Sequence, residues 1–247
     1  MSKLDNILFY ASMSFLLLCI FLTFLFFGPK KIIEKEEFVF VTSDKKEMLN
    51  LTLELIEEGD LLLSRPKSLI GGYEYDTKNR INLNQLTYFF WYNIFDKLII
   101  NSMGNTYWHI GIYIGQEKIN SLYQGVYEHE INENLINYKY FKVLKIKTSE
   151  ENKILAIKRA KEHFKKQDVY YSNKNGLIIV YLESIGSKRI YSLKENELVC
   201  SSYIGLIYNE IKFNDKPFTH LTPVALEFSE KVETKFLVNE TGFFIKK

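Results

Sequence analysis

Apolar and polar positions along the chain follow two periods. Short segments in which apolar residues alternate with polar ones or form unbroken runs predict strands. They are "FVFV" (38–41), "DLLLS" (60–64), "WHIGIYIG" (108–115), "KINSLY" (118–123), "GVYEHEI" (125–131), "FKVLKIK" (141–147) and "KFLV" (235–238). Apolar residues three and four positions apart predict helices over 45–58, 148–166, 176–186 and 201–211, and we interpret the aromatic run 86–100 as another helix.

Polar residues mark where two helices begin. Thr148, three residues before Glu151, forms a capping-box pattern. Four apolar residues then follow one face of that helix: Ile154, Ile157, Ala160 and Phe164. Thr222 before Pro223 predicts the cap and first residue of a further helix. Helices before and after a run of strands predict an α+β fold with a mostly antiparallel sheet.

A long apolar run without a charged residue precedes this domain, from Ile7 to Phe27. Its 21 residues would extend roughly 30 Å as a helix, the hydrocarbon thickness of a bilayer. The run is followed by "GPKK" rather than by a small-x-small cleavage site, so we expect a retained anchor and not a cleaved signal peptide. The sequence predicts a transmembrane anchor over 1–28, a stalk over 29–45 and a folded domain over 46–247.

The charges next to the apolar run predict how it crosses the membrane. Three lysines follow the run closely and one precedes it, which favours a single-pass protein with its C-terminal domain in the cytoplasm. Glycosylation triplets at Asn50 and Asn239 would permit the opposite orientation.

Composition and missing motifs exclude several function classes. The 32 Lys and Arg residues against 30 Asp and Glu leave a net charge of +2, so we expect no nucleic-acid partner. The chain has no CxxC or HExxH pattern, no phosphate-binding glycine loop and no GxSxG sequence. We therefore expect neither a metal nor a cofactor.

Cys200 is the first candidate for chemistry. The other cysteine, Cys19, lies inside the apolar run, which leaves Cys200 as a free thiol. If a helix begins just before Ser201, Cys200 lies at its N-terminus, where backbone N–H groups and the helix dipole favour a thiolate. A free cysteine is also among the most buried residue types, so Cys200 could equally fill the core.

A thiol nucleophile needs a base, and the chain offers four histidines. His163 is near the end of an amphipathic helix, His129 lies in an acidic run that we expect to face solvent, and His220 precedes a helix start. His109 differs because it opens a glycine-bearing strand, a rigid element that would hold an imidazole in place.

Five motifs together resemble the circularly permuted papain-like amidases, relatives of the NlpC-type cell-wall peptidases and of the lecithin:retinol acyltransferases. The motifs are "EEGDLLLS" (57–64), "YWHIGIYIGQEKIN" (107–120), "QDVYY" (167–171), "ELVCSSYIGLIY" (197–208) and "LTPVALEFS" (221–229). In that family a histidine strand precedes a nucleophilic cysteine on a helix, the reverse of the order in papain. The resemblance implies a permuted papain-like fold, with Cys200 as nucleophile and His109 as base.

The same resemblance implies a third polar residue on the strand after the histidine, and that position falls at Asn120. Asn120 could orient the imidazole through its side-chain carbonyl. Ser121, Glu117 or Glu128 could replace it, and a shift of one residue would turn Asn120 to the other face of its strand. Asp60, in the Gly-Asp-Leu motif, is expected to bond the backbone where its strand begins.

Three functions remain open. The first is a membrane-anchored cysteine amidase or peptidase that forms an acyl-thioester on Cys200. The second keeps the fold but acts on lipids as an acyltransferase, thioesterase or phospholipase, although "VCSSY" differs from the Asn-Cys-Glu-His-Phe motif typical of the acyltransferases. The third is a non-catalytic papain-like binding or virion module. The expected partners are the membrane, through 7–27, and a peptide or lipid substrate with an amide or ester bond.

Overall fold

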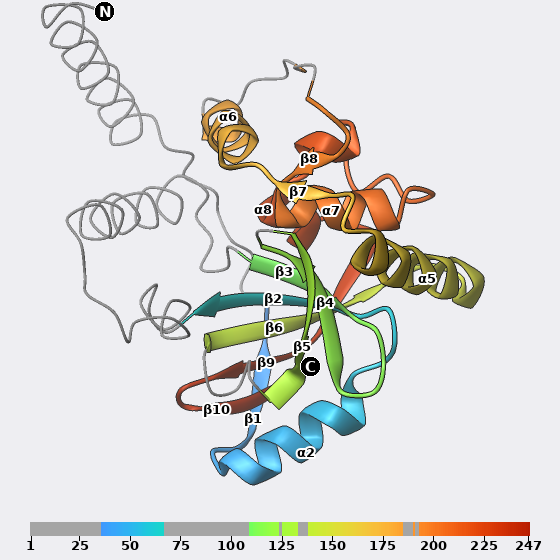
Figure 1. Cartoon of the computed structure of the whole chain (residues 1–247). Helices are drawn as coiled ribbons and strands as arrows, with labels where there is room; N and C mark the ends of the chain where they lie inside the picture. The colour runs from blue at the N-terminus through green and yellow to red at the C-terminus, as the bar shows by residue number, and fades with distance from the viewer. Residues whose placement is uncertain (1–35, 67–108, 124, 133–137, 185–189, 191–192) are drawn as a thin grey trace, which may run out of the picture.

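The computed structural model describes residues 36–66, 109–123, 125–132, 138–184, 190 and 193–247 (Figure 1). Its strands are β1 (Phe38–Thr42), β2 (Leu61–Pro66), β3 (His109–Tyr113), β4 (Lys118–Leu122), β5 (Val126–Glu130), β6 (Tyr138–Ile146), β7 (Tyr170–Tyr171), β8 (Glu197–Leu198), β9 (Val232–Asn239) and β10 (Gly242–Lys246). Its helices are α2 (Lys45–Leu55), α5 (Glu150–Lys166), α6 (Asn173–Ser184), α7 (Cys200–Ile207), α8 (Pro223–Glu227) and the 3-10 helix η2 (Phe218–His220).

Eight of these strands form one sheet, in the order β1-β10-β9-β6-β2-β3-β4-β5. Every pairing within it is antiparallel. Strands β7 and β8 form a separate parallel pair. The predicted α+β class, with a large antiparallel sheet packed against helices, is confirmed.

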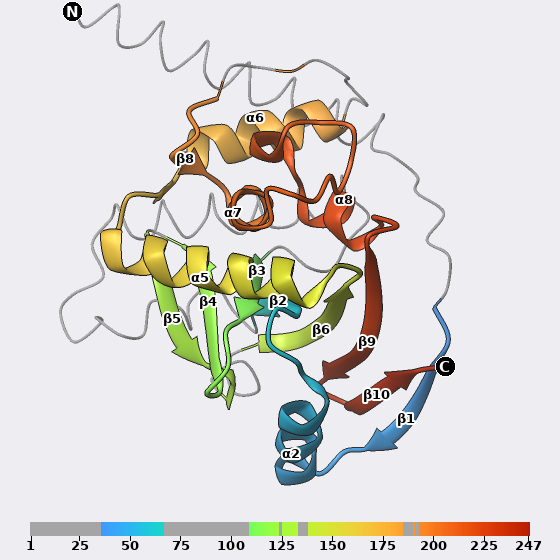
Figure 2. The same ribbon diagram turned by 90° about the vertical axis from the view of Figure 1, so that its right-hand side faces the viewer.

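Helices lie on both faces of the sheet. Helices α5, α6 and α7 are on one side, which we call the helix face, and α2 is on the other (Figure 2). Successive strand residues point to opposite faces, so each buried strand contributes to two apolar cores. Leu61, Ile110 and Ile112 pack with α5 and α7, whereas Leu62 and Phe236 pack in the core on the side of α2.

Most of the predicted elements are present, and two details are corrected. Helix α5 is capped by Ser149, whose side chain accepts from the backbone N–H of Asn152, and not by Thr148. Ile154 and Phe164 were expected on the buried face of α5 but are 65% and 36% exposed, because that face is formed by Lys153, Ala156, Ile157 and Ala160. The expected helix 86–100 lies outside the described residues.

The N-terminal boundary of the sheet differs from the expected arrangement. The strand expected at 38–41 within the stalk is β1, and it pairs with β10 at one edge of the sheet. Glu36, just before it, binds the buried amine of Lys142 at 2.7 Å. Among the described residues, no helix has both the length and the apolar character needed to cross a bilayer. The expected anchor, 1–28, lies outside them.

A substitution at Phe236 measures how much the core on the side of α2 contributes to the stability of the fold. Its ring is fully buried and stacks on Phe243 with 4.9 Å between ring centroids. We expect Phe236→Ala to lower the free energy of unfolding by about 3–5 kcal/mol, because the truncation leaves a cavity. Urea unfolding of the full-length protein measures this loss. The matched control is Phe228→Ala, at a ring that is 48% exposed. Equal losses in the two variants would contradict the core assignment.

Candidate active site

Cys200 is the first residue of α7, as the sequence predicts. The preceding Val199 is extended and has no side-chain bond to the helix, so the chain passes directly from β8 into α7. Two hydroxyls of the first turn hold this end of the helix in place. Ser201 donates to the carbonyl of Leu221 at 2.6 Å, and Ser202 donates to the carbonyl of Thr219 at 3.0 Å.

The thiol of Cys200 lies against β3. It is 4% exposed and belongs to the same core as Ile110 and Ile112. Burial raises the pKa of the Cys200 thiol to about 11, although the backbone N–H groups of Ile110, Ser201 and Cys200 itself favour the thiolate. Ile110 directly follows His109, so the structure places the two candidate residues at the same end of β3.

His109 is the first residue of β3 and is 7% exposed. Its Nε2 atom lies 3.4 Å from the hydroxyl oxygen of Tyr127 on β5. The rings of Tyr123 and Tyr127 each lie 6.5 Å from the imidazole, centroid to centroid. Burial, and next the charge of His129, lower the pKa of His109 to about 3.

Both candidate groups are therefore neutral at physiological pH. A thiol with a pKa of about 11 and an imidazole with a pKa of about 3 do not form a thiolate–imidazolium pair at rest. A reaction at this site would have to transfer the thiol proton as the sulfur attacks, which is general-base catalysis.

The register of the central strands separates the candidates for the third residue. Gly111 pairs with Ser121, and Ile112 pairs with Asn120. Because strand residues alternate between faces, Ser121 shares the face of His109 and Asn120 points to the helix face. Cys200 packs on that helix face, so the thiol and the imidazole approach the end of β3 from its two sides. Among the described residues, the buried Oγ of Ser121 has no hydrogen-bond partner.

Asn120 binds the helices and does not orient the imidazole in this structure. Its Oδ1 accepts a hydrogen bond of 2.7 Å from the hydroxyl of Tyr203 on α7. Its Nδ2 donates to the carbonyl of Ala160 on α5 at 3.4 Å. The expected contact with His109 is replaced by two contacts that hold α5 and α7 on the sheet.

Neither Glu117 nor Glu128 takes the third position beside His109. Glu117 is exposed in the tight turn between β3 and β4, where its φ is 59°. Glu128 pairs with Asn120, so it lies on the helix face, and its carboxylate is 4.0 Å from the amine of Lys118.

The remaining histidines are accounted for by local contacts. His163 lies 2.7 Å from the carboxylate of Asp168, near the end of α5. His220 is buried, with its Nδ1 3.0 Å from the hydroxyl of Thr219. His129 was expected to face solvent, but it is only partly exposed and stacks on Tyr127 at 5.1 Å. It thus belongs to the surroundings of His109.

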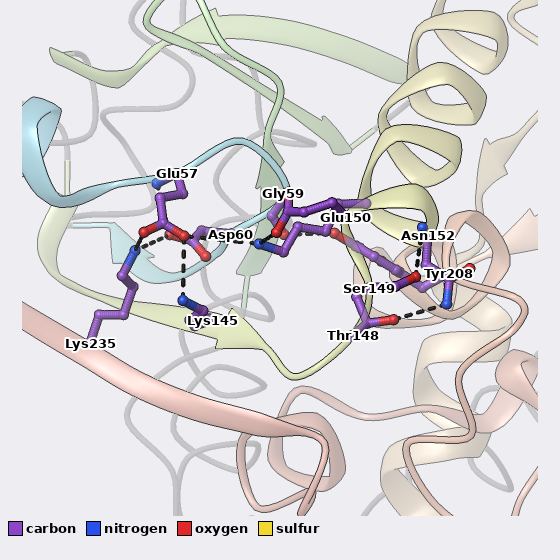
Figure 3. Close-up of polar contacts among 11 residues, drawn as sticks. Glu57, Gly59, Asp60, Lys145, Thr148, Ser149, Glu150, Asn152, Tyr208 and Lys235 are labelled. Carbon is purple, nitrogen blue, oxygen red and sulfur yellow. Dashed lines mark hydrogen bonds and ion pairs between the residues drawn. The ribbon is translucent and has the colours of Figure 1, made fainter.

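Asp60 has the expected role of bonding the backbone where β2 begins. Its Oδ2 accepts from the backbone N–H of Glu57 and from the amine of Lys235, each at 2.9 Å. Figure 3 shows Glu57 placed between Lys235 and Lys145, with Asp60 beside it. Burial raises the pKa of Asp60, and its bonds to Glu57 and Lys235 oppose that rise. These contacts join β2, β6 and β9.

Gly59, next to Asp60, permits a close contact with α7. Its φ of +91° is in the left-handed region that favours glycine. Its carbonyl accepts a hydrogen bond of 2.7 Å from the hydroxyl of Tyr208, which directly follows α7 (Figure 3). A Cβ at this position would come within 2.9 Å of that hydroxyl. The Gly-Asp-Leu motif therefore helps to fix the contact between the start of β2 and the end of α7.

Tyr127 and Tyr203 contact the candidate residues but were not identified from the sequence. The alternation of 125–131 carries the signal for Tyr127, since every second residue of β5 shares the face of His109 once β4 and β5 are paired. Tyr203 lies in the apolar spacing of α7, where a tyrosine is indistinguishable from other core residues.

Searches against protein-family models and against curated proteins give no match to this chain. In the described segments, no group of three or more His, Cys, Asp or Glu side chains is placed to hold a metal ion. The assignment of the candidate site therefore rests on the geometry of this chain alone.

The low pKa of His109 predicts a specific loss of stability in acid. The imidazole has an ordinary pKa of 6.5 when unfolded and about 3 when folded, so the unfolded chain binds its proton first. The contribution of this pKa difference to the free energy of unfolding is complete above pH 6.5 and is lost as the pH falls toward 3. We expect wild type to lose about 1.4 kcal/mol per pH unit relative to His109→Gln in that window.

Urea unfolding of both proteins from pH 7 to pH 4 measures this difference. The groups around the imidazole are Tyr123, Tyr127 and His129, with the Cys200 thiol at the same end of β3, and all remain in the variant. Parallel stability curves for the two proteins would contradict the assigned burial of a neutral His109.

Asn120 is expected to contribute stability through Tyr203. Asn120→Ala leaves the hydroxyl of Tyr203 buried without this acceptor, which should cost about 1–3 kcal/mol of unfolding free energy. Tyr203→Phe combined with Asn120→Ala should cost less than the sum of the two single changes, because both remove the same bond. Chemical unfolding of the three variants measures this coupling, and strictly additive losses would refute it.

Proposed function

We propose that this chain is a membrane-anchored thiol hydrolase with a permuted papain-like fold. It cleaves an amide bond, in a peptide or a lipid-linked substrate, through an acyl-thioester on Cys200. The observation that carries the proposal is the position of Cys200. It is the first residue of a helix docked on β3, with its thiol at the amide that follows His109.

The proposed reaction has two stages. His109 takes the proton of the Cys200 thiol while the sulfur attacks the substrate carbonyl carbon, and the resulting imidazolium gives that proton to the leaving amine as the C–N bond breaks. Because the Cys200 thiol and the His109 imidazole approach β3 from opposite faces, the proton passes between them at the end of the strand. Water then attacks the thioester, His109 takes a proton from the water, and the thiol is restored as the acid leaves. The net change is the hydrolysis of one amide bond.

Backbone groups of α7 support the anionic intermediate in this mechanism. The N–H groups of Cys200 and Ser201 are at the unpaired N-terminal end of the helix, and both already favour negative charge on the sulfur. Donors of this kind stabilise the oxyanion that develops when the sulfur attacks a carbonyl. The bonds of Ser201 and Ser202 to the segment 219–221 keep this turn in position.

Acylation of Cys200 tests the proposal directly. Full-length protein carrying Cys19→Ser, so that Cys200 is the only thiol, is treated near pH 7 with 4-nitrophenyl acetate. We expect an acetyl group on Cys200, detected by peptide mass spectrometry, because the base compensates for the high thiol pKa. His109→Gln should slow the acylation roughly 100-fold or more.

The matched control is His163→Gln, since His163 pairs with Asp168 on α5. It should acylate at the wild-type rate. A Cys200 that stays unmodified, or that reacts equally fast without His109, would contradict the enzyme proposal and favour a non-catalytic binding module. Once acylation is seen, offering a mixed peptide and lipid extract identifies the acyl group by the adduct mass on Cys200.

A further inference from the structure

The surroundings of His109 determine which ring nitrogen could act as the base. Nε2 is the atom that faces the hydroxyl of Tyr127, at 3.4 Å. For Nδ1, the described part of the chain shows no hydrogen bond. A neutral imidazole carries one proton, so a donor at Nε2 leaves Nδ1 with the free lone pair. Catalytic hydrogen bonds are often long in the absence of substrate and shorten when it binds.

Stacked rings hold the imidazole plane in this orientation. The ring of Tyr127 lies at 27° to His109 and at 20° to His129, so three rings are nearly parallel. Tyr123 meets His109 edge-on, at 83°. Such contacts restrict rotation of the imidazole about its χ2 torsion.

Tyr127 and His109 lie on the same face of the sheet, on two strands that are separated by β4. Tyr127 on β5 pairs with Ser121 on β4, and Ser121 pairs with Gly111 on β3. Tyr127, Ser121 and Gly111 are thus opposite one another on the face that also carries His109, two residues before Gly111. A Cβ at Gly111 would come within 2.6 Å of Ile119 and 3.1 Å of Ser121, so the strands are already in tight contact there.

We propose that Tyr127 is the positioning residue for His109, accepting a hydrogen bond from Nε2–H so that Nδ1 takes the proton of Cys200. Tyr127 then fills the place for which the sequence suggested Asn120. The inference rests on the proposed hydrolase function and adds to it the third member of the site.

The role follows from the movement of protons. When Nδ1 takes the thiol proton, the imidazolium carries protons on both nitrogens, and the Tyr127 oxygen accepts from the one on Nε2. Nδ1 then releases its proton to the leaving group, and the ring returns to the Nε2–H form. The Tyr127 hydroxyl keeps its own proton throughout, so it orients the base without itself titrating.

The histidine tautomer tests the inference without requiring activity. Nitrogen-15 NMR of histidine-labelled full-length protein in detergent distinguishes Nε2–H from Nδ1–H, and His109→Gln assigns the signal. We expect the Nε2–H form in wild type and a shift toward Nδ1–H in Tyr127→Phe, which keeps the ring and removes the hydroxyl. A wild-type Nδ1–H form, or the same tautomer in both proteins, would overturn the proposal.

The matched control is Tyr113→Phe. It removes a hydroxyl from the same face of β3, where the partner is the backbone N–H of Glu117 at 3.3 Å. This variant should keep the wild-type tautomer. A purely structural contribution of Tyr127 would leave the tautomer unchanged in Tyr127→Phe as well.

Acylation kinetics separate this inference from the function on which it rests. In the Cys19→Ser protein, Tyr127→Phe should slow acetylation of Cys200 about tenfold, the factor expected for one hydrogen bond, while Tyr113→Phe has no effect. Acetylation that is normal in both variants would overturn the role of Tyr127 and leave the hydrolase intact. A wild-type Cys200 that is never acetylated would overturn the hydrolase, and the positioning role of Tyr127 in its reaction with it.

Discussion

The candidate site depends on how α7 is docked on the central strands. Most of that contact is apolar and would tolerate small shifts along the helix axis, because apolar contacts have no preferred direction. The buried bond between the Tyr203 hydroxyl and Asn120 is directional and joins α7 to β4. Together with the bonds of Ser201, Ser202 and Tyr208 at the two ends of the helix, it selects one position of α7, and with it the position of Cys200 relative to β3.

Burial has opposite effects on the two residues at this end of β3. It raises the pKa of the thiol and lowers that of the imidazole, and each change makes the charged form harder to reach. A neutral pair avoids the cost of an unpaired buried charge, which favours the folded state. The exclusion of water from a buried site also strengthens the interaction of backbone N–H dipoles with an oxyanion that develops during a reaction. The structure thus holds the thiol and the imidazole in their neutral forms, and in the proposed hydrolase the same surroundings would suit a charged transition state.

Local patterns predicted most of the elements, and long-range pairing accounts for what they missed. Thr222 and Pro223 mark the start of α8 because a cap is set by neighbouring residues. The choice between Asn120 and Ser121 is different, since it depends on which residue of β3 lies opposite each of them. A shift of one residue in the pairing turns every side chain of β4 to the other face, and the sequence alone does not record which of the two registers forms.

The surroundings of His109 illustrate the same limit. His109 was predicted to lie on a rigid strand, and it does, but its contact with Tyr127 crosses β4. No spacing rule connects residues on two strands that are separated by a third. The contact could have been found only after the order β3-β4-β5 was known.

The pairing of β1 with β10 brings the two ends of the described fold together. The backbone N–H of Lys247 donates to the carbonyl of Glu37 at 3.1 Å, so a short linker could join them into a ring. A ring of this kind could be opened at another exposed loop while the packing of α7 on β3 stayed the same. Whether the histidine or the cysteine comes first along the chain is then a matter of where the ring is opened, and the geometry of the site does not depend on it.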